Sequence, residues 1–194
     1  MVFQDPMSSL NPVFTIGDQM RTILKYADRR LRRSRSRQER MHRVLEVLGQ
    51  VRMRDPERVA HSYPIMLSGG MRQRVMIAMA LACEPQVLIA DEPTTALDVT
   101  LQRQILDILK RKKEEGMSIV LITHDLGVAR YFCDRVIVMY AGRAVERGAT
   151  HELLSTPGHP YSVGLLNSTL EIGMSGQDLQ SIPGNPPDMA HLPH

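Results

Sequence analysis

Two adjacent carboxylates at the end of a short apolar run are the first candidates for chemistry in this sequence. Asp91 and Glu92 follow directly on "VLIA". A carboxylate at Asp91 can hold Mg²⁺, directly or through water, while Glu92 can accept a proton from a water that attacks a terminal phosphate. The pair alone favours a plainer alternative, in which the two acids cap the loop that follows.

A Ser-Gly-Gly turn supplies a second candidate, an anion site. Ser68 can cap a helix that begins near Gly70, and the two glycines leave backbone N–H groups uncovered. The dipole of that helix favours a negative charge at the same end. A cap of this kind is common and, taken alone, is usually structural.

A third candidate, His124, follows the apolar run "IVLIT". An imidazole at the carboxyl end of that strand would reach the phosphate that Asp91 and Glu92 serve. Asp125 is better explained as the cap of the next helix. A lone histidine in this place is more often structural, so the functional interpretation of His124 depends on the motifs around it.

From residue 68 onward the sequence alternates between helices and apolar strands, as a scaffold for these residues requires. The expected helices are 70–82, 99–114, 126–132, 150–155 and 160–169, and the expected strands are 87–91, 118–123 and 135–140, with a turn at 141–143 into a further short strand. This alternation predicts an α/β core in which helices pack on the faces of a parallel sheet. Ligands bind at the carboxyl edge of such a sheet. After Glu171 the Pro- and Gly-rich sequence predicts little regular structure.

Residues 15–62 instead have the pattern of a small helical unit. Ser36 and Glu39 can form a capping box before apolar residues at helical spacing, and Asp55-Pro56 starts another short helix. Eight arginines fall between Arg29 and Arg43. We favour a solvated face and linker for them over the alternative, a nucleic-acid site.

Composition limits the class of protein further. The 194 residues, of which 43% are hydrophobic, suffice for one ordinary core, with a modest formal net charge of +3. The apolar runs are far shorter than the roughly 20 residues of a membrane-spanning helix, and the first residues do not resemble a secretory signal, so we expect a soluble cytosolic domain. Cys83 and Cys133 have no ligand-spaced Cys or His nearby, which favours two buried, reduced thiols over a metal cluster.

Taken together and in this order, the motifs resemble those of a known protein family. The sequence resembles the nucleotide-binding subunit of ATP-binding cassette (ABC) transporters over essentially its whole length. "LSGGMRQRV" is similar to the signature motif, "VLIADE" to the Walker B strand, "TTALD" to the D-loop, "THD" to the switch-histidine motif and "VFQDP" to the Q-loop. The resemblance implies a P-loop NTPase-like ABC ATPase core of the α/β class, incomplete here, with a parallel sheet, flanking helices and a small helical subdomain.

The same resemblance implies a role for each matching residue. Glu92, His124 and Gln4 would be catalytic, and Asp91 with Gln4 would hold Mg²⁺. The residues expected to contact ATP are Ser68, Gly69, Gly70, Gln73 and Asp98. Two such subunits would sandwich ATP head to tail on the cytoplasmic side of membrane permease subunits, with a substrate-binding protein involved indirectly and nucleic acid not at all.

The termini resemble one branch of the family. "MVFQDPMSSLNP", "TPGHPYSVGLLNSTL" and "IPGNPPD" look like the importers of dipeptides, oligopeptides and sometimes nickel, with His159, Pro160 and Tyr161 as the His-Pro-Tyr motif. The implied division is 1–14 for the Q-loop and the approach to the helical subdomain, 15–66 for that subdomain, 67–148 for half of the catalytic core and 149–194 for the C-terminal extension.

A phosphate-cradling loop needs a Gly-Lys pair, and no lysine of this chain follows a glycine. We therefore expect the Walker A loop to be absent, the isolated chain to be inactive, and Met1 to be an internal methionine of a longer protein. Two alternatives remain open: an ABC ATPase associated with nucleic acid through its arginines, and a non-catalytic regulatory or assembly fragment.

Overall fold

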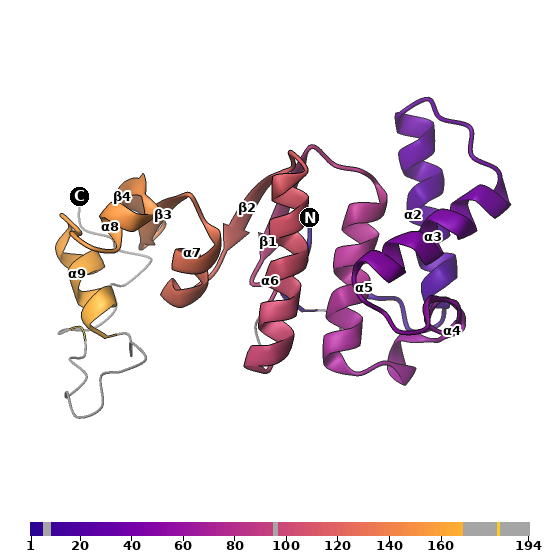
Figure 1. The fold of residues 1–194 in the computed structure, drawn as a ribbon, viewed down its shortest axis with the longest axis horizontal. Coiled ribbons are helices and arrows are strands. Elements are labelled where there is room, and N and C mark those ends of the chain that lie inside the picture. Colours follow the sequence, from indigo (N-terminus) through magenta and orange to yellow (C-terminus); the bar gives the residue numbers. More distant parts are fainter. Residues whose placement is uncertain (6–8, 95–96, 169–181, 183–194) are drawn as a thin grey trace. The chain divides into compact units, whose positions relative to one another are not determined.

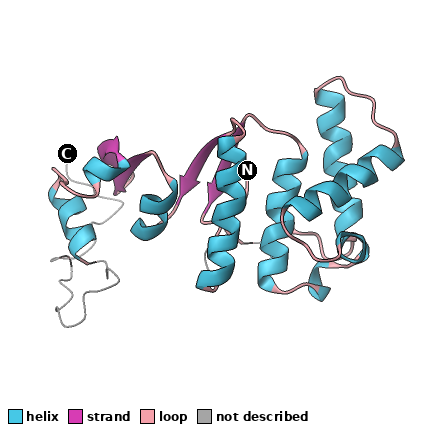
Figure 2. Ribbon diagram, in the orientation of Figure 1, coloured by secondary structure: helices cyan, strands magenta, loops and turns pink. Residues whose placement is uncertain are grey.

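The chain divides into two units, Met1–Ile122 and Thr123–His194. Within the first unit, a helical part is followed by an α/β part. The structure, a computed structural model, describes residues 1–5, 9–94, 97–168 and 182. Figure 1 shows the order of the elements and Figure 2 their types. The expectation for the chain after Glu171 lies outside the described residues, except for Ile182.

Each α-helix of the helical part begins at a side-chain cap. α2 (Ile16–Arg30) follows Thr15, whose hydroxyl accepts from the N–H of Asp18. α3 (Arg37–Gln50) begins with the predicted capping box, in which the Ser36 hydroxyl accepts from Glu39 N–H and the Glu39 carboxylate accepts from Ser36 N–H at 2.6 Å. α4 (Pro56–His61) follows Asp55, as predicted. A short 3₁₀ helix, η1 (Pro64–Met66), leads to α5 (Gly69–Ala82).

The core of the helical part is mainly apolar. Its fully buried side chains lie at helical spacing on α2, α3 and α5 and include Ile16, Met20, Leu24, Val44, Val47, Leu48, Val75, Ile77 and Leu81. α2 and α4 approach closely, because a Cβ added at Gly17 would lie 2.8 Å from the carbonyl oxygen of Ala60. Burial of these side chains holds the helical part together.

The arginine cluster is more structural than we expected. Arg35 and Arg40 pair with the carboxylate of Asp28, which is 1% exposed, at 3.1 and 2.9 Å. Arg33 and Arg35 also pair with Glu84, just after α5, at 2.8 and 2.9 Å. Hydrogen bonds from Arg33 and then Arg35 hold the pKa of Glu84 below its ordinary value. Arg33, Arg35 and Arg40 therefore tie α2, α3 and the end of α5 together, while most of the eight arginines are exposed, as expected for a solvated face.

The α/β part contains β1 (Val87–Asp91), α6 (Val99–Glu114) and β2 (Ser118–Ile122), close to the predicted bounds. β1 and β2 pair in parallel, with Asp91 opposite Ile122. Val2 adds a parallel bridge to Ala90 of β1. The predicted parallel arrangement is confirmed for these strands.

The two faces of the β1–β2 sheet differ. Leu88 and Ala90 are buried. The opposite face carries Val87, Ile89, Val120 and Ile122, which are 56%, 39%, 52% and 47% exposed. We refer to these four residues as the exposed apolar face.

The second unit contains α7 (Leu126–Phe132), β3 (Arg135–Tyr140), β4 (Arg143–Ala149), α8 (Thr150–Leu153) and α9 (Pro160–Asn167). β3 forms at the predicted residues, but its pairing within the described chain is antiparallel with β4. Ala141 and Gly142 both have positive φ, at 48° and 77°, which suits a tight hairpin turn. Local hairpin pairing therefore replaces the parallel pairing that the alternation suggested.

Cys83 and Cys133 are both thiols, but each is half-buried rather than buried. Each lies at the C-terminal cap of a helix, where side chains reach towards solvent. Burial still raises the pKa of Cys83. Within the described residues, no helix has the length and apolar character needed to cross a bilayer.

Candidate functional site

The carboxyl end of β1 brings together two residues that lie 88 positions apart in the chain. The side-chain amide of Gln4 donates from Nε2 to Glu92 Oε2 at 2.7 Å. Backbone pairing places Gln4 there, since Val2 N–H donates to the carbonyl of Ile89 at 2.8 Å and Asp91 N–H donates to that of Val2 at 3.0 Å. The first residues thus run beside β1 and deliver Gln4 to its end.

The backbone of Glu92 is fixed in an uncommon conformation. Its φ is 42°, in the left-handed region that residues other than glycine seldom adopt. Its N–H donates to the carbonyl of Ile122 at 2.9 Å, which ties it to the end of β2. Backbone strain of this kind persists where the surrounding structure enforces it and is frequent at functional sites.

Asp91 is the last residue of β1 and is half-buried. Its carboxylate shares the strand end with the amide of Gln4. Because the Gln4 nitrogen is engaged by Glu92, the amide oxygen is left as an acceptor. Asp91 and Gln4 thus offer hard oxygen ligands at one edge of the sheet.

The Ser-Gly-Gly turn forms the start of α5, as predicted. Ser68 is its N-cap and accepts from Met71 N–H at 3.3 Å. Nothing lies within 4 Å of a Cβ added at Gly69, which leaves the backbone there accessible. A Cβ at Gly70 would instead lie 2.7 Å from Leu101 Cδ1. Gly70 therefore allows α5 to approach α6.

Gln73 and Asp98 both make structural hydrogen bonds, Gln73 from a buried position and Asp98 from an exposed one. Gln73 is 3% exposed, and its amide donates to the carbonyl of Pro93 at 2.7 Å, which supports the loop after Glu92. Asp98 is the N-cap of α6 and accepts from Leu101 N–H at 2.9 Å. Asp98 thus helps to position the leucine that contacts Gly70.

His124 belongs to the second unit and is exposed. Asp125 caps α7 by accepting from Val128 N–H at 3.1 Å, as predicted. His124 therefore lies in the short connection between β2 and a capped helix.

The His-Pro-Tyr segment is also a capped helix start. His159 Nδ1 accepts from Tyr161 N–H at 3.1 Å, and Pro160 occupies the first turn of α9. Glu146 of β4 accepts from the N–H groups of Gly158 and His159 at 2.7 and 3.3 Å. The ring of Tyr161 lies 4.5 Å from that of Tyr140. β3 and β4 therefore hold this segment in place.

Sequence reasoning missed three features of the site: the pairing of Val2 with β1, the contact of Gln4 with Glu92, and the internal use of Gln73. The only local signal for the first was the apolar pair Val2-Phe3 ahead of Gln4, which is too short to predict a strand. The other two are long-range contacts that no periodicity encodes.

The arrangement agrees with comparisons to known proteins. The family model described as "ABC transporter" matches residues 1–95, and that of the "Oligopeptide/dipeptide transporter, C-terminal region" matches residues 145–194. A dimeric post-hydrolysis structure of the ATP-binding cassette MJ0796 bound to ADP and Pi superposes with a TM-score of 0.65 at 37% identity, over 77% of this chain and 61% of that one. The chain belongs to the ABC transporter ATP-binding family and has the fold of an ABC ATPase core.

The relatives indicate which branch of the family this chain is most similar to. A putative peptide import ATP-binding protein of Brucella ovis is 51% identical, over 100% of this chain and 58% of its own length. The oligopeptide transport ATP-binding protein OppD of Salmonella typhimurium is 48% identical, over 100% of this chain and 56% of its own length. The chain thus spans somewhat more than half the length of these relatives, and its resemblance to the peptide-importer branch is confirmed.

Proposed function

We propose that this chain is part of the ATP-hydrolysing subunit of a peptide importer, for dipeptides or oligopeptides, with nickel as the alternative cargo. The observation that carries the proposal is the hydrogen bond from Gln4 to Glu92 at the carboxyl edge of β1. It joins the proposed Q-loop glutamine to the acid after the proposed Walker B strand, and so places the two proposed catalytic side chains together. The names of the relatives support peptides as the cargo.

Glu92 is the proposed general base. Its backbone is fixed through the bond to Ile122 and its carboxylate is oriented by Gln4. A carboxylate held in this way can accept the proton of a water that attacks the terminal phosphate, a contribution of roughly 10² to 10⁴ in rate. Gln4 would orient Glu92 through its amide nitrogen and offer its amide oxygen as a ligand. His124 is proposed to contact the same phosphate.

The donors at this edge fit Mg²⁺, which binds proteins through one or two carboxylates and completes its shell with phosphate and water. Asp91 and the amide oxygen of Gln4 would hold the ion. Within the described residues no group of three or more His, Cys, Asp or Glu side chains gathers as a metal site. A bound Mg²⁺ would offset the negative charge of the phosphate oxygens.

The Ser68 turn is proposed to serve a nucleotide held by a second subunit. Ser68, Gly69 and Gly70 begin a 14-residue helix, whose N-terminal dipole favours an anion. The dimeric form of the solved relative bound to ADP and Pi supports pairing of two subunits, which we propose to be head to tail. Gln73 and Asp98 would support this surface through their hydrogen bonds to the backbone of Pro93 and Leu101.

The remaining partners follow from the same proposal. Permease subunits would dock on the helical subdomain on the cytoplasmic side of the membrane, and a substrate-binding protein would deliver the cargo. The proposed division into 1–14, 15–66, 67–148 and 149–194 assigns docking to the first two segments and chemistry to the third. The ion pairs of Arg33, Arg35 and Arg40 give no support to the nucleic-acid alternative.

The test is Glu92→Gln in this chain joined to the N-terminal segment of a relative that contains G-x-x-x-x-G-K-[ST]. Hydrolysis should fall by about 10² or more, and ATP should trap closed dimers, detected by size-exclusion chromatography. The control is Glu114→Gln, an exposed acid at the end of α6, which should hydrolyse ATP at the parent rate. Unchanged hydrolysis in the Glu92 variant would contradict the proposed role of Glu92 as the general base.

A further inference from the structure

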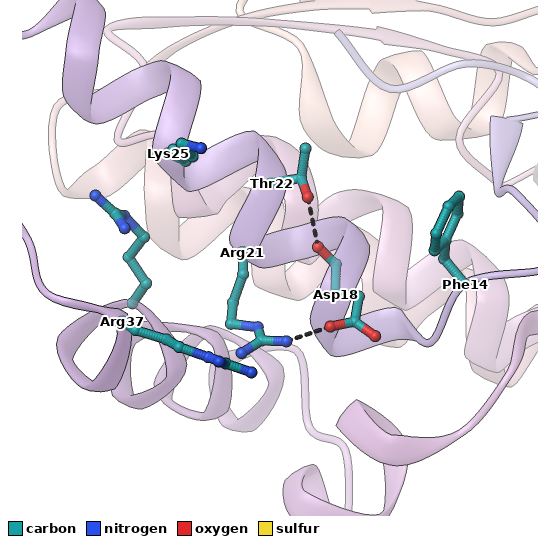
Figure 3. Close-up of a pocket in the computed structure, with 7 residues that line it drawn as sticks. Phe14, Asp18, Arg21, Thr22, Lys25 and Arg37 are labelled. Carbon is teal, nitrogen blue, oxygen red and sulfur yellow. Dashed lines mark hydrogen bonds and ion pairs between the residues drawn. The ribbon is translucent and has the colours of Figure 1, made fainter.

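An open pocket with a volume of ≈ 500 Å³ lies on the helical part of the first unit and shares no residue with the site described above. One face of α2 supplies Asp18, Arg21, Thr22 and Lys25, which recur at helical spacing. The start of α3 supplies Arg37 and Arg40. Figure 3 shows Asp18, Arg21, Thr22 and Lys25 along α2 and Arg37 at the start of α3.

Positive charge dominates the pocket. Four of its side chains are cations and one is a carboxylate. Arg21 pairs with Asp18, and Arg40 pairs with the buried Asp28 at 2.9 Å. Among the described residues, Lys25 and Arg37 have no ion-pair partner. The pocket therefore keeps two cations without a direct ion pair, of which Arg37 interacts with Asp18 only at longer range; we call Lys25 and Arg37 the unbalanced cations.

Arg21 gives a second, independent observation. Its Nε is buried and makes no hydrogen bond within the described residues, although the guanidinium also pairs with Asp18. A buried donor without an acceptor is unfavourable, so a reorientation of the Arg21 guanidinium that brings this donor to an anion would be favoured. An anion in the pocket would also relieve the repulsion between the cations.

We propose that this pocket binds a phosphomonoester group. A dianion matches the two unbalanced charges of Lys25 and Arg37, and the planar guanidinium groups suit the bidentate geometry of phosphate oxygens. Phe14, whose side chain is 54% exposed, lines the same pocket and offers an apolar wall to the organic part of the ligand. The phosphate has two possible sources, a small soluble phosphomonoester or the headgroup of phosphatidic acid.

The experiment uses the 194-residue chain with two probes. Phenyl phosphate is titrated against the arginine Nε–Hε signals in NMR spectra, and vesicles of phosphatidylcholine with or without phosphatidic acid are tested by co-sedimentation. The variant Lys25→Gln with Arg37→Gln removes the two unbalanced cations, both exposed, and should weaken binding about tenfold or more. The matched control, Lys110→Gln with Arg111→Gln, removes two exposed cations from α6 and should change it less than about twofold.

Each outcome decides the proposal. Binding of phenyl phosphate that depends on Lys25 and Arg37 supports a soluble ligand, and the same dependence for vesicles containing phosphatidic acid supports a lipid headgroup. Absence of binding by both probes overturns the proposal. Equal weakening in the two double variants also overturns it, because only net charge would then matter.

Discussion

The buried amide of Gln73 donates to the carbonyl of Pro93 at 2.7 Å, and so joins the middle of α5 to the loop that follows Glu92. Substitution Gln73→Ala leaves this carbonyl without a partner in a buried place. The cost should be about 1 to 3 kcal/mol of the free energy of unfolding, measured by urea denaturation. Gln38→Ala, on the exposed side of α3, is the control and should cost less than about 0.5 kcal/mol. Equal losses in both variants would mean that the bond to Pro93 contributes nothing particular.

The two glycines after Ser68 should respond differently to alanine. Gly70→Ala places a methyl group 2.7 Å from Leu101 Cδ1, whereas Gly69→Ala meets nothing within 4 Å. We expect Gly70→Ala to destabilise the chain by about 1 to 2 kcal/mol through overpacking, and Gly69→Ala to be neutral or slightly stabilising. Thermal unfolding of both variants measures the difference.

A double-mutant cycle identifies the contact. If Leu101 is the obstacle, the added cost of Gly70→Ala should largely disappear in a Leu101→Ala background. An unchanged cost there would place the strain elsewhere in the turn.

Sequence patterns were sufficient where the signal was local. The capping box of Ser36 and Glu39, the strand 87–91 and the helix 99–114 all formed as predicted. Each depends on caps and periodicity within about a dozen residues, which one stretch of chain contains by itself.

Long-range contacts were not predictable from the same patterns. Asp28 lies in an arginine-rich segment that reads as solvated, but Arg35 and Arg40 allow it to be buried. The pairing of Gln4 with Glu92 depends on Val2 entering the sheet, and the pairing of β3 depends on the turn at Ala141 and Gly142. Tertiary contacts decided the first two, and a local hairpin turn decided the pairing of β3.

The ion pairs of Glu84 predict a specific acid sensitivity. Hydrogen bonds from Arg33 and Arg35 lower the pKa of Glu84 from its ordinary value of 4.5 in the folded chain. Its contribution to stability is therefore complete above about pH 4.5 and is lost as the pH falls through the lowered value. Glu84→Gln should lower the free energy of unfolding at pH 7 by about 0.5 to 1 kcal/mol, because the pair is partly exposed.

The pH dependence separates this role from simple loss of packing. The difference in stability between Glu84→Gln and the parent should shrink as the pH falls below 4.5. A difference that stays constant down to the acid transition would contradict the ionic role of Glu84.

The exposed apolar face of the β1–β2 sheet predicts self-association of the 194-residue chain. Ile89 and Val120 are opposite one another on this face. The variant Ile89→Thr with Val120→Thr should reduce association, measured by light scattering against concentration, because it removes contiguous apolar surface. Val99→Thr, at an isolated position that is 80% exposed, should not. A similar reduction by Val99→Thr would assign the effect to general hydrophobicity.

The 194-residue chain by itself should not hold ATP tightly. The residues gathered at the edge of β1 are proposed to act on a terminal phosphate. Gln4, Asp91 and Glu92 provide one amide and two carboxylates, and carboxylates repel the phosphates unless a cation lies between them. Most of the attraction in this class comes from the backbone N–H groups and the lysine of a G-x-x-x-x-G-K-[ST] loop, which these residues do not contain. Equilibrium dialysis with Mg-ATP should therefore give no saturation in the micromolar range, and joining the chain to such a loop should produce it. Micromolar affinity of the unjoined chain, unaffected by Asp91→Asn, would mean that ATP is bound by a site other than the one proposed here.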